Sequence, residues 1–179
     1  MESTPTATPC FQTVTLIRGD GIGPEITAAV QEILDAAGIP ITWDEQSAGL
    51  ECAQRYGTPL PPATLESIVR NRVALKGPTT TPVGTGHKSI NVTIRKALDL
   101  FANVRPARSL PGVRTRFENV DLIVLRENIE DTYGGIEHWQ TPEVVQQLRI
   151  ITRPGSEAFL RFAFELARSQ GRRRSTCVH

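Results

Sequence analysis

The sequence predicts an α/β fold built on parallel strands, and three observations support this. Short apolar segments rich in β-branched residues alternate with longer segments whose apolar residues recur at helical spacing. Glycine and proline separate these segments, as they do at turns. Hydrophobic residues make up 39% of the 179 residues and charged residues 22%, so the chain can bury a core and is not disordered by composition.

The first half of the chain alternates three predicted strands with two predicted helices. Pro24 opens the first helix at a position where proline is tolerated, and Gly38 ends it. Apolar residues recur at helical spacing between them, at Ile26, Val30, Ile33 and Leu34. The strands are expected at residues 13–17, 41–48 and 72–78, and the helices at 24–38 and 61–71. Such alternation predicts parallel pairing of the three strands.

The second half is predicted to hold further strands between two helices. A loop rich in glycine and threonine, residues 77–88, leads into a helix near 89–99. Strands are expected at 100–107, 121–128 and 144–152, and a last helix at 155–170. One face of that helix is apolar, at Phe159, Phe162, Ala163 and Leu166. The sequence ends in "RRRSTCVH", which reads as a polar turn and the start of a strand, so we expect it to be part of a longer polypeptide.

Charge and cysteine content argue against several classes of protein. Twenty basic and 19 acidic residues give a net charge of +1, which does not favour nucleic-acid binding. Cys10, Cys52 and Cys177 form no CxxC pair, which disfavours a zinc site or a disulfide framework and fits a reducing compartment. No apolar run approaches the roughly 20 residues that cross a membrane. Residues 1–12 resemble neither a secretory nor an import signal, so we expect a disordered leader and a cytoplasmic protein.

The segment "GDGIGPE", residues 19–25, is a candidate cofactor-binding turn. A dinucleotide fingerprint requires G-x-G-x-x-G, whereas here the third glycine comes one residue early, at Gly23, and proline follows it. Asp44 and Glu45 lie nearby, but neither clearly ends a second strand at the required distance. The residues therefore favour a strand-to-helix turn that needs glycine's conformational freedom, although the helix N-terminus could still attract an anion.

A second candidate site begins at the segment "SINVTIRK". Asn91 and Arg95 are four residues apart and share one face of the predicted helix. Ser89 stands at or beside the helix start, where a hydroxyl group and backbone N–H groups can meet an anion.

Two arginines and a tyrosine extend this candidate site. Arg105 and Arg126 each follow an apolar segment, and we expect them at strand ends, where open α/β sheets place their sites. Together with Arg95 they could bind a substrate that carries several carboxylates. The alternative is that Arg105 pairs with Asp99, and Arg126 with Glu127. Tyr133 could act as a general acid or base, or could be an ordinary core or rim residue.

Three segments give the chain a resemblance to a known family. They are "GDGIGPE", "ALKGPTTTPVGTGHKSINVTIRKALDLFANVRP" and "DLIVLRENIEDTYGGIEH", and they occur in the family's order. From about residue 13 onward the chain resembles the N-terminal half of an isocitrate dehydrogenase, within the isocitrate/isopropylmalate dehydrogenase family. The resemblance implies an isopropylmalate dehydrogenase-like two-domain fold, non-Rossmann and here truncated.

The resemblance also implies roles for individual residues. Substrate carboxylates would contact Ser89, Asn91, Arg95, Arg105 and Arg126. Tyr133 would help to protonate the enol that remains after carbon dioxide departs. The cofactor would lie near Ile22, Thr79, Thr81 and Asn91. NAD is favoured over NADP by "GHKS" and "FANVRP", and the metal would be Mg²⁺ or Mn²⁺, bound by aspartates that this chain does not contain.

The implied activity is oxidative decarboxylation of isocitrate to 2-oxoglutarate by a full-length homodimer, without nucleic acid or membrane partners. By the same resemblance, residues 13–100 belong to a large domain, 101–133 and 153–179 to a small domain, and 134–152 to a dimerisation clasp. Two alternatives stay open. One is a related enzyme acting on isopropylmalate, homoisocitrate or tartrate, and the other is a non-catalytic relative that binds a tricarboxylate.

Overall fold

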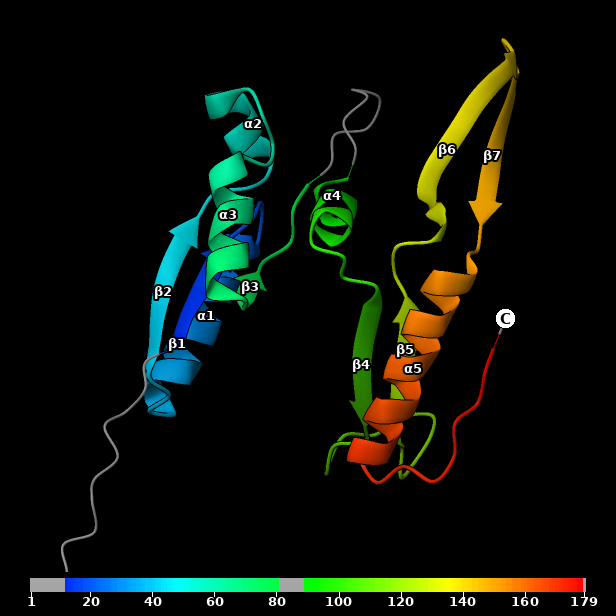
Figure 1. Cartoon of the computed structure of the whole chain (residues 1–179). Helices are drawn as coiled ribbons and strands as arrows, with labels where there is room; N and C mark the ends of the chain where they lie inside the picture. The colour runs from blue at the N-terminus through cyan, green and yellow to red at the C-terminus, as the bar shows by residue number, and fades with distance from the viewer. Residues whose placement is uncertain (1–11, 81–88, 179) are drawn as a thin grey trace, which may run out of the picture. The chain divides into compact units, whose positions relative to one another are not determined.

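The computed structural model describes residues 12–80 and 89–178. The chain divides into two compact units, Met1–Ala97 and Leu98–His179. Figure 1 labels the elements of each unit. Among the described residues, no helix has both the length and the apolar character needed to cross a membrane.

The first unit is a small α/β unit with a three-stranded sheet. Its elements are β1 (Gln12–Ile17), α1 (Gly23–Ala36), β2 (Ile41–Gln46), α2 (Leu50–Tyr56), α3 (Pro62–Asn71), β3 (Ala74–Lys76) and α4 (Ile90–Ala97). The strand order is β2-β1-β3, and both pairings are parallel. The predicted parallel arrangement is therefore confirmed. The helix α2 was not predicted.

The central strand β1 carries most of the core of this unit. Val14, Thr15, Leu16 and Ile17 are all buried, with Leu16 and Ile17 fully so. A run buried on both faces is typical of a parallel strand with neighbours on each side. The helix α3 packs against β1 and β2 (Figure 1).

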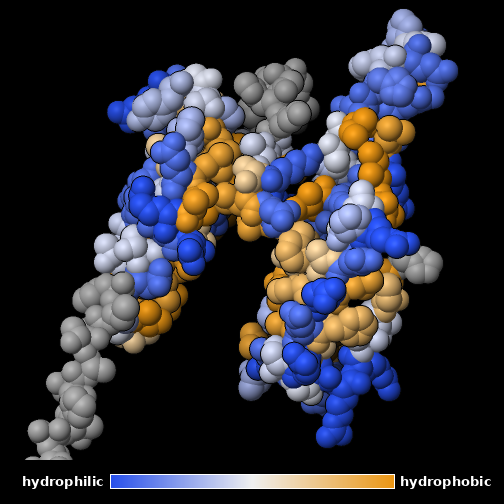
Figure 2. Space-filling model, in the orientation of Figure 1, coloured by the Kyte–Doolittle hydropathy of each residue, from blue (hydrophilic) through white to orange (hydrophobic). Residues whose placement is uncertain are grey.

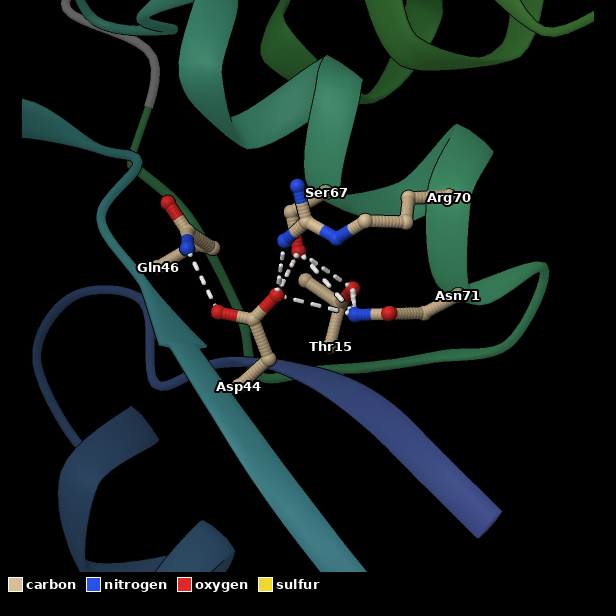
Figure 3. A network of polar contacts seen from close by, with 6 residues as sticks. All are labelled: Thr15, Asp44, Gln46, Ser67, Arg70 and Asn71. Atoms are coloured by element: carbon tan, nitrogen blue, oxygen red, sulfur yellow. Dashed lines mark hydrogen bonds and ion pairs between the residues drawn. The ribbon is translucent and has the colours of Figure 1, made fainter.

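A network of polar side chains joins α3 to the sheet (Figure 3). Ser67 donates to Asp44 at 2.7 Å and shares a hydrogen bond of 2.7 Å with Thr15. Arg70 also contacts Asp44, at 2.5 Å, and Asn71 contacts it at 2.9 Å. These donors, led by Ser67, hold the pKa of Asp44 far below its ordinary value of 3.8. Because every donor satisfies an oxygen that would otherwise be poorly solvated, the network fixes how α3 sits on the sheet.

The helix α1 presents an unexpected face. Gly23 and Thr27 are its buried residues, whereas Ile26, Val30 and Ile33 are exposed by 42%, 36% and 66%. The apolar spacing thus located the helix correctly, but these apolar side chains do not lie in the core of this unit. Figure 2 shows apolar surface on both units.

The second unit is built from two antiparallel strand pairs and one helix. Its elements are β4 (Ala102–Arg108), β5 (Asp121–Glu127), β6 (Asp131–Thr141), β7 (Val144–Ile150) and α5 (Arg153–Ser169). β4 pairs with β5 and β6 pairs with β7. No helix connects the members of either pair, as a parallel crossover would usually require. The strand β6 was not predicted.

The last helix confirms its predicted apolar face. Phe159, Phe162, Ala163 and Leu166 are all part-buried on α5. The ring of Phe162 packs edge-to-face on that of Phe101, with centroids 5.8 Å apart. The helix begins at Thr152, whose hydroxyl accepts a hydrogen bond from the Gly155 N–H at 3.1 Å.

Candidate active site

The glycines of "GDGIGPE" allow close backbone approach in the turn between β1 and α1. A Cβ atom on Gly19 would lie 1.9 Å from the carbonyl oxygen of Pro78, and one on Gly23 would lie 2.2 Å from that of Arg18. The structure therefore agrees with the predicted strand-to-helix turn. Ile22 occupies the N-cap position of α1 with its side chain 66% exposed. Its contact with a cofactor stays a prediction.

The last residue of β3, Lys76, is a half-buried lysine that sequence reasoning missed. Lys76 Nζ donates to the carbonyl oxygen of Gly77 at 2.6 Å and lies 3.4 Å from Thr79 Oγ1. Burial lowers the pKa of Lys76 below its ordinary value. The negative charge of Asp20 raises this pKa, and the positive charge of Arg95 lowers it further. The position of Lys76 directly before "GP" at a strand end could have identified it. Thr81 lies outside the described residues.

The helix α4 presents Asn91 and Arg95 as predicted, on a face different from its buried residues. Ile90 and Ile94 are buried, whereas Asn91 and Arg95 are part-exposed. Ser89 stands immediately before the helix, and its carbonyl oxygen accepts the N–H of Thr93 at 2.9 Å. Within the described part of the chain, Arg95 forms no ion pair, so its guanidinium is available to a ligand.

Arg105 and Arg126 lie on neighbouring strands, and one of them lies near a strand end as predicted. Arg126 is the sixth of the seven residues of β5, whereas Arg105 is the fourth of the seven residues of β4, so its predicted position at a strand end is wrong. Both strands extend beyond these arginines, because β4 and β5 remain paired from Arg108 opposite Asp121 to Ala102 opposite Glu127.

The register nevertheless brings these two arginines to one face. Arg105 stands opposite Val124, two residues from Arg126, and side chains two apart on a strand share a face. Arg105 and Arg126 are therefore diagonal neighbours, within reach of one another's long side chains. Arg105 Nε donates to Asn103 Oδ1 at 2.9 Å, and Asn103 stands directly opposite Arg126.

Tyr133, at the start of β6, joins this group. Arg126 donates a hydrogen bond to the Tyr133 hydroxyl, and its guanidinium carbon lies 5.2 Å from the centre of the tyrosine ring. The structure thus brings together Arg105, Arg126 and Tyr133 in the second unit, and Ser89, Asn91 and Arg95 in the first. That all six form one site stays a prediction.

The alternative ion pairs are not found among the described residues. Arg105 and Arg126 form no ion pair there, with Asp99, Glu127 or any other acid. Glu127 instead accepts hydrogen bonds from the backbone N–H groups of Ile129, at 2.8 Å, and Glu130. Because these donors occupy the carboxylate, the two arginines keep an uncompensated positive charge.

Glu130 is a supporting residue that sequence reasoning missed. Its carboxylate accepts from the backbone N–H of Thr152 at 2.9 Å and from the Thr152 hydroxyl, at the start of α5. A Cβ atom on Gly155 would lie 2.2 Å from Glu130 Oε1, so glycine leaves room for this carboxylate. The contact anchors the chain between Arg126 and Tyr133 to the helix, and its partners are too distant in sequence to be predicted.

The described residues also bear on whether a group of side chains could bind a metal ion. In residues 12–80 and 89–178, no group of three or more histidine, cysteine, aspartate or glutamate side chains is placed to hold a metal ion. The described residues therefore supply cationic groups for an anionic ligand rather than anionic groups for a cation.

The sequence matches the family described as isocitrate/isopropylmalate dehydrogenase over residues 13–179. It is 50% identical over 167 residues to isocitrate dehydrogenase [NAD] subunit 2, mitochondrial, of Saccharomyces cerevisiae, covering 93% of this chain and 45% of that protein. It is 48% identical to the chloroplastic 3-isopropylmalate dehydrogenase of Solanum tuberosum, covering 92% of this chain and 46% of that one.

The chain is also similar to a solved structure of an isocitrate dehydrogenase. The crystal structure of isocitrate dehydrogenase from Methylococcus capsulatus is similar to this chain with a TM-score of 0.85 and 49% identity, covering 90% of this chain and 49% of that one. The chain spans about half the length of the relatives that it matches.

Proposed function

This chain belongs to the isocitrate/isopropylmalate dehydrogenase family, and we propose that it serves the oxidative decarboxylation of isocitrate to 2-oxoglutarate with NAD or NADP. One observation carries the proposal. Arg105 and Arg126 share a face of the β4–β5 pair beside Tyr133, and among the described residues neither has an acidic partner. Two exposed guanidiniums without carboxylates of their own favour a ligand that brings carboxylates with it.

The charge of the ligand favours isocitrate over a less acidic relative. Isocitrate carries three carboxylates, and Arg105 and Arg126 of the second unit offer guanidiniums for two of them. In the first unit, α4 presents the further guanidinium of Arg95. Guanidinium forks bind carboxylates in a fixed plane, so they can orient the substrate as well as attract it. Ser89 precedes α4 and Asn91 lies on it, so they add polar groups that favour a carboxylate over an isopropyl group.

The chemistry assigns different tasks to these residues. A nicotinamide cofactor, when bound near Ile22 and Thr79, would supply the acceptor for the hydride on C2 of isocitrate. The arginines hold the carboxylates so that C2 is presented in one orientation. The Tyr133 hydroxyl gives a proton to C3 of the enolate that decarboxylation leaves, and the cation of Arg126 beside it stabilises the phenolate that remains.

The residues of this chain fit the cofactor better than the metal. Lys76 places a cation at the end of β3, and Thr79 places a hydroxyl on the loop that follows. Ile22 offers an exposed apolar contact at the start of α1. The described residues include no cluster of acids that fits a divalent ion.

Steady-state assays on the polypeptide expressed from its complete gene test the proposal. Reduction of NAD and of NADP is followed at 340 nm, with isocitrate and 3-isopropylmalate as alternative substrates. We expect kcat/KM for isocitrate to exceed that for 3-isopropylmalate by roughly a hundredfold or more, because the latter leaves an arginine unpaired. Preference for 3-isopropylmalate would overturn the substrate, and isocitrate binding without turnover would favour a non-catalytic relative.

A further inference from the structure

We propose that Asp20 is a positioning residue that holds the loop of residues 77–80 in place for the cofactor. The consequence for the cofactor rests on the proposed function, in which Thr79 of this loop contacts the nicotinamide. The attachment itself rests on the geometry of the first unit.

The carboxylate of Asp20 joins the turn after β1 to the loop after β3 and to the first residue of α2, which follows β2. Asp20 stands in the turn after β1. Its Oδ2 atom accepts a hydrogen bond from the backbone N–H of Thr80, after β3, at 2.6 Å. Its Oδ1 atom accepts one from the backbone N–H of Leu50, after β2, at 2.9 Å. The backbone N–H of Asp20 donates to the carbonyl oxygen of Pro78 at 2.8 Å, which gives the loop a second attachment.

Glycines leave room for this arrangement. Gly49 has φ +127°, and a Cβ atom there would lie 2.3 Å from Asp20 Oδ1. A Cβ atom on Gly77 would lie 2.1 Å from the carbonyl oxygen of Arg18. A Cβ atom on Gly19 would likewise clash with the carbonyl oxygen of Pro78. At all three positions the neighbouring atoms are therefore too close for any residue but glycine. The contact is therefore specific in shape as well as in charge.

An ionised carboxylate is the group that this position requires. Both of its oxygens accept hydrogen bonds, whereas an asparagine amide offers one acceptor and would turn its NH₂ group toward one of the two N–H donors. Asp20 also supports the positive charge of Lys76, whose ammonium lies beside Thr79. Loss of the carboxylate would thus remove the side-chain attachment of the loop at Thr80, and would also remove a negative charge that favours the ammonium form of Lys76.

A matched control is available in the same neighbourhood. Asp20 and Glu51 both line a hollow of about 180 Å³ beside β1, β2 and α2. Glu51 stands in the first turn of α2 and is exposed. Within the described residues, no hydrogen bond links its side chain to the loop of residues 77–80. Glu51→Gln therefore removes one negative charge from the same hollow and leaves the attachment intact.

The test compares Asp20→Asn, Asp20→Glu and Glu51→Gln with the wild type, all expressed from the complete gene. Amide hydrogen exchange reports the attachment at residues 77–80, and steady-state kinetics report KM for the cofactor. For Asp20→Asn we expect exchange in this loop and KM for the cofactor to rise roughly tenfold or more, because a hydrogen bond to a charged acceptor is lost. KM for isocitrate at saturating cofactor should change less than about twofold, and Glu51→Gln should match the wild type.

The outcomes separate the inference from the proposed function. An active wild type whose cofactor KM and loop exchange do not change in Asp20→Asn overturns the inference alone. A wild type that oxidises isocitrate with neither cofactor overturns the proposed function, and exchange at residues 77–80 in Asp20→Asn then tests the attachment alone. If Asp20→Asn does not fold, Asp20→Glu decides, since it keeps the charge but moves the carboxylate away from Thr80. Wild-type values in that variant also overturn the inference.

Discussion

The two units of the chain are stabilised in different ways. In the first, β1 is buried from Val14 to Ile17, and the polar network around Asp44 fixes α3 to the sheet. In the second unit, Asn128 is the one buried residue among those that the structure describes. Every residue of β7 is exposed, and no residue of α5 is buried. The first unit thus has a core of its own, whereas the second relies on strand pairing and a partly covered helix.

This difference bears on the proposed function. The residues predicted to contact the cofactor lie in the unit that has a core, and the exposed arginines lie in the one that does not. A rigid support can hold a loop within the small tolerance that hydride transfer requires. Exposed arginines on an open strand pair can instead adjust to the carboxylates of a ligand.

The largest expected effect comes from removing a core side chain of the first unit. Leu16 is fully buried in β1, so Leu16→Ala leaves a cavity in the core. We expect the free energy of unfolding to fall by about 2–5 kcal/mol, measured by urea denaturation. A loss below about 1 kcal/mol would contradict the account of β1 as the central core strand.

A smaller effect should follow the charge of Asp44. Its pKa is lowered in the folded state, so the folded chain binds fewer protons there than the unfolded chain. The resulting stability is present above the ordinary value of 3.8 and is lost as the pH falls below it. Urea denaturation between about pH 6 and pH 3 should show a steeper loss for the wild type than for Asp44→Asn. Identical pH profiles would show that the network contributes nothing to stability.

The smallest effect is expected on the exposed side of α5. Phe164 is 63% exposed, and serine has a similar helix propensity, so Phe164→Ser should change the free energy of unfolding by less than about 1 kcal/mol. The same change should reduce the fluorescence of a bound hydrophobic dye, since it removes exposed apolar surface. A large loss of stability would mean that the second unit has a core that includes this side chain.

The sequence predicted elements with clear periodicity and missed those without it. β1 is a short apolar segment, and α1 and α5 have apolar residues at helical spacing. A glycine stands two residues after the end of each of the three elements. The helix α2 has seven residues and starts after Gly49 with no side-chain cap, so it offered no such signal. In β6 two consecutive glycines, Gly134 and Gly135, lack the side chains whose alternation indicates a strand.

The candidate site was predictable in its residue types but not in its supports. Asn91 and Arg95 share a helix face because four-residue spacing dictates it. The partners of Asp20 lie 30 and 60 residues away, so its role depends on the folded structure. The pairing of Arg126 with Tyr133, rather than with Glu127, likewise depends on a turn whose backbone N–H groups occupy the acid.

The central claim is that Arg105 and Arg126, which have no acidic partner among the described residues, bind the carboxylates of isocitrate. The most direct measurement is kcat/KM for isocitrate in Arg105→Gln beside Arg108→Gln, in the polypeptide expressed from its complete gene. Arg108 lies on the same strand but is paired with Asp121 at 3.2 Å, so it is a control of equal charge. We predict a loss of roughly tenfold or more for Arg105→Gln and less than about twofold for Arg108→Gln. Equal effects of the two changes would contradict the claim.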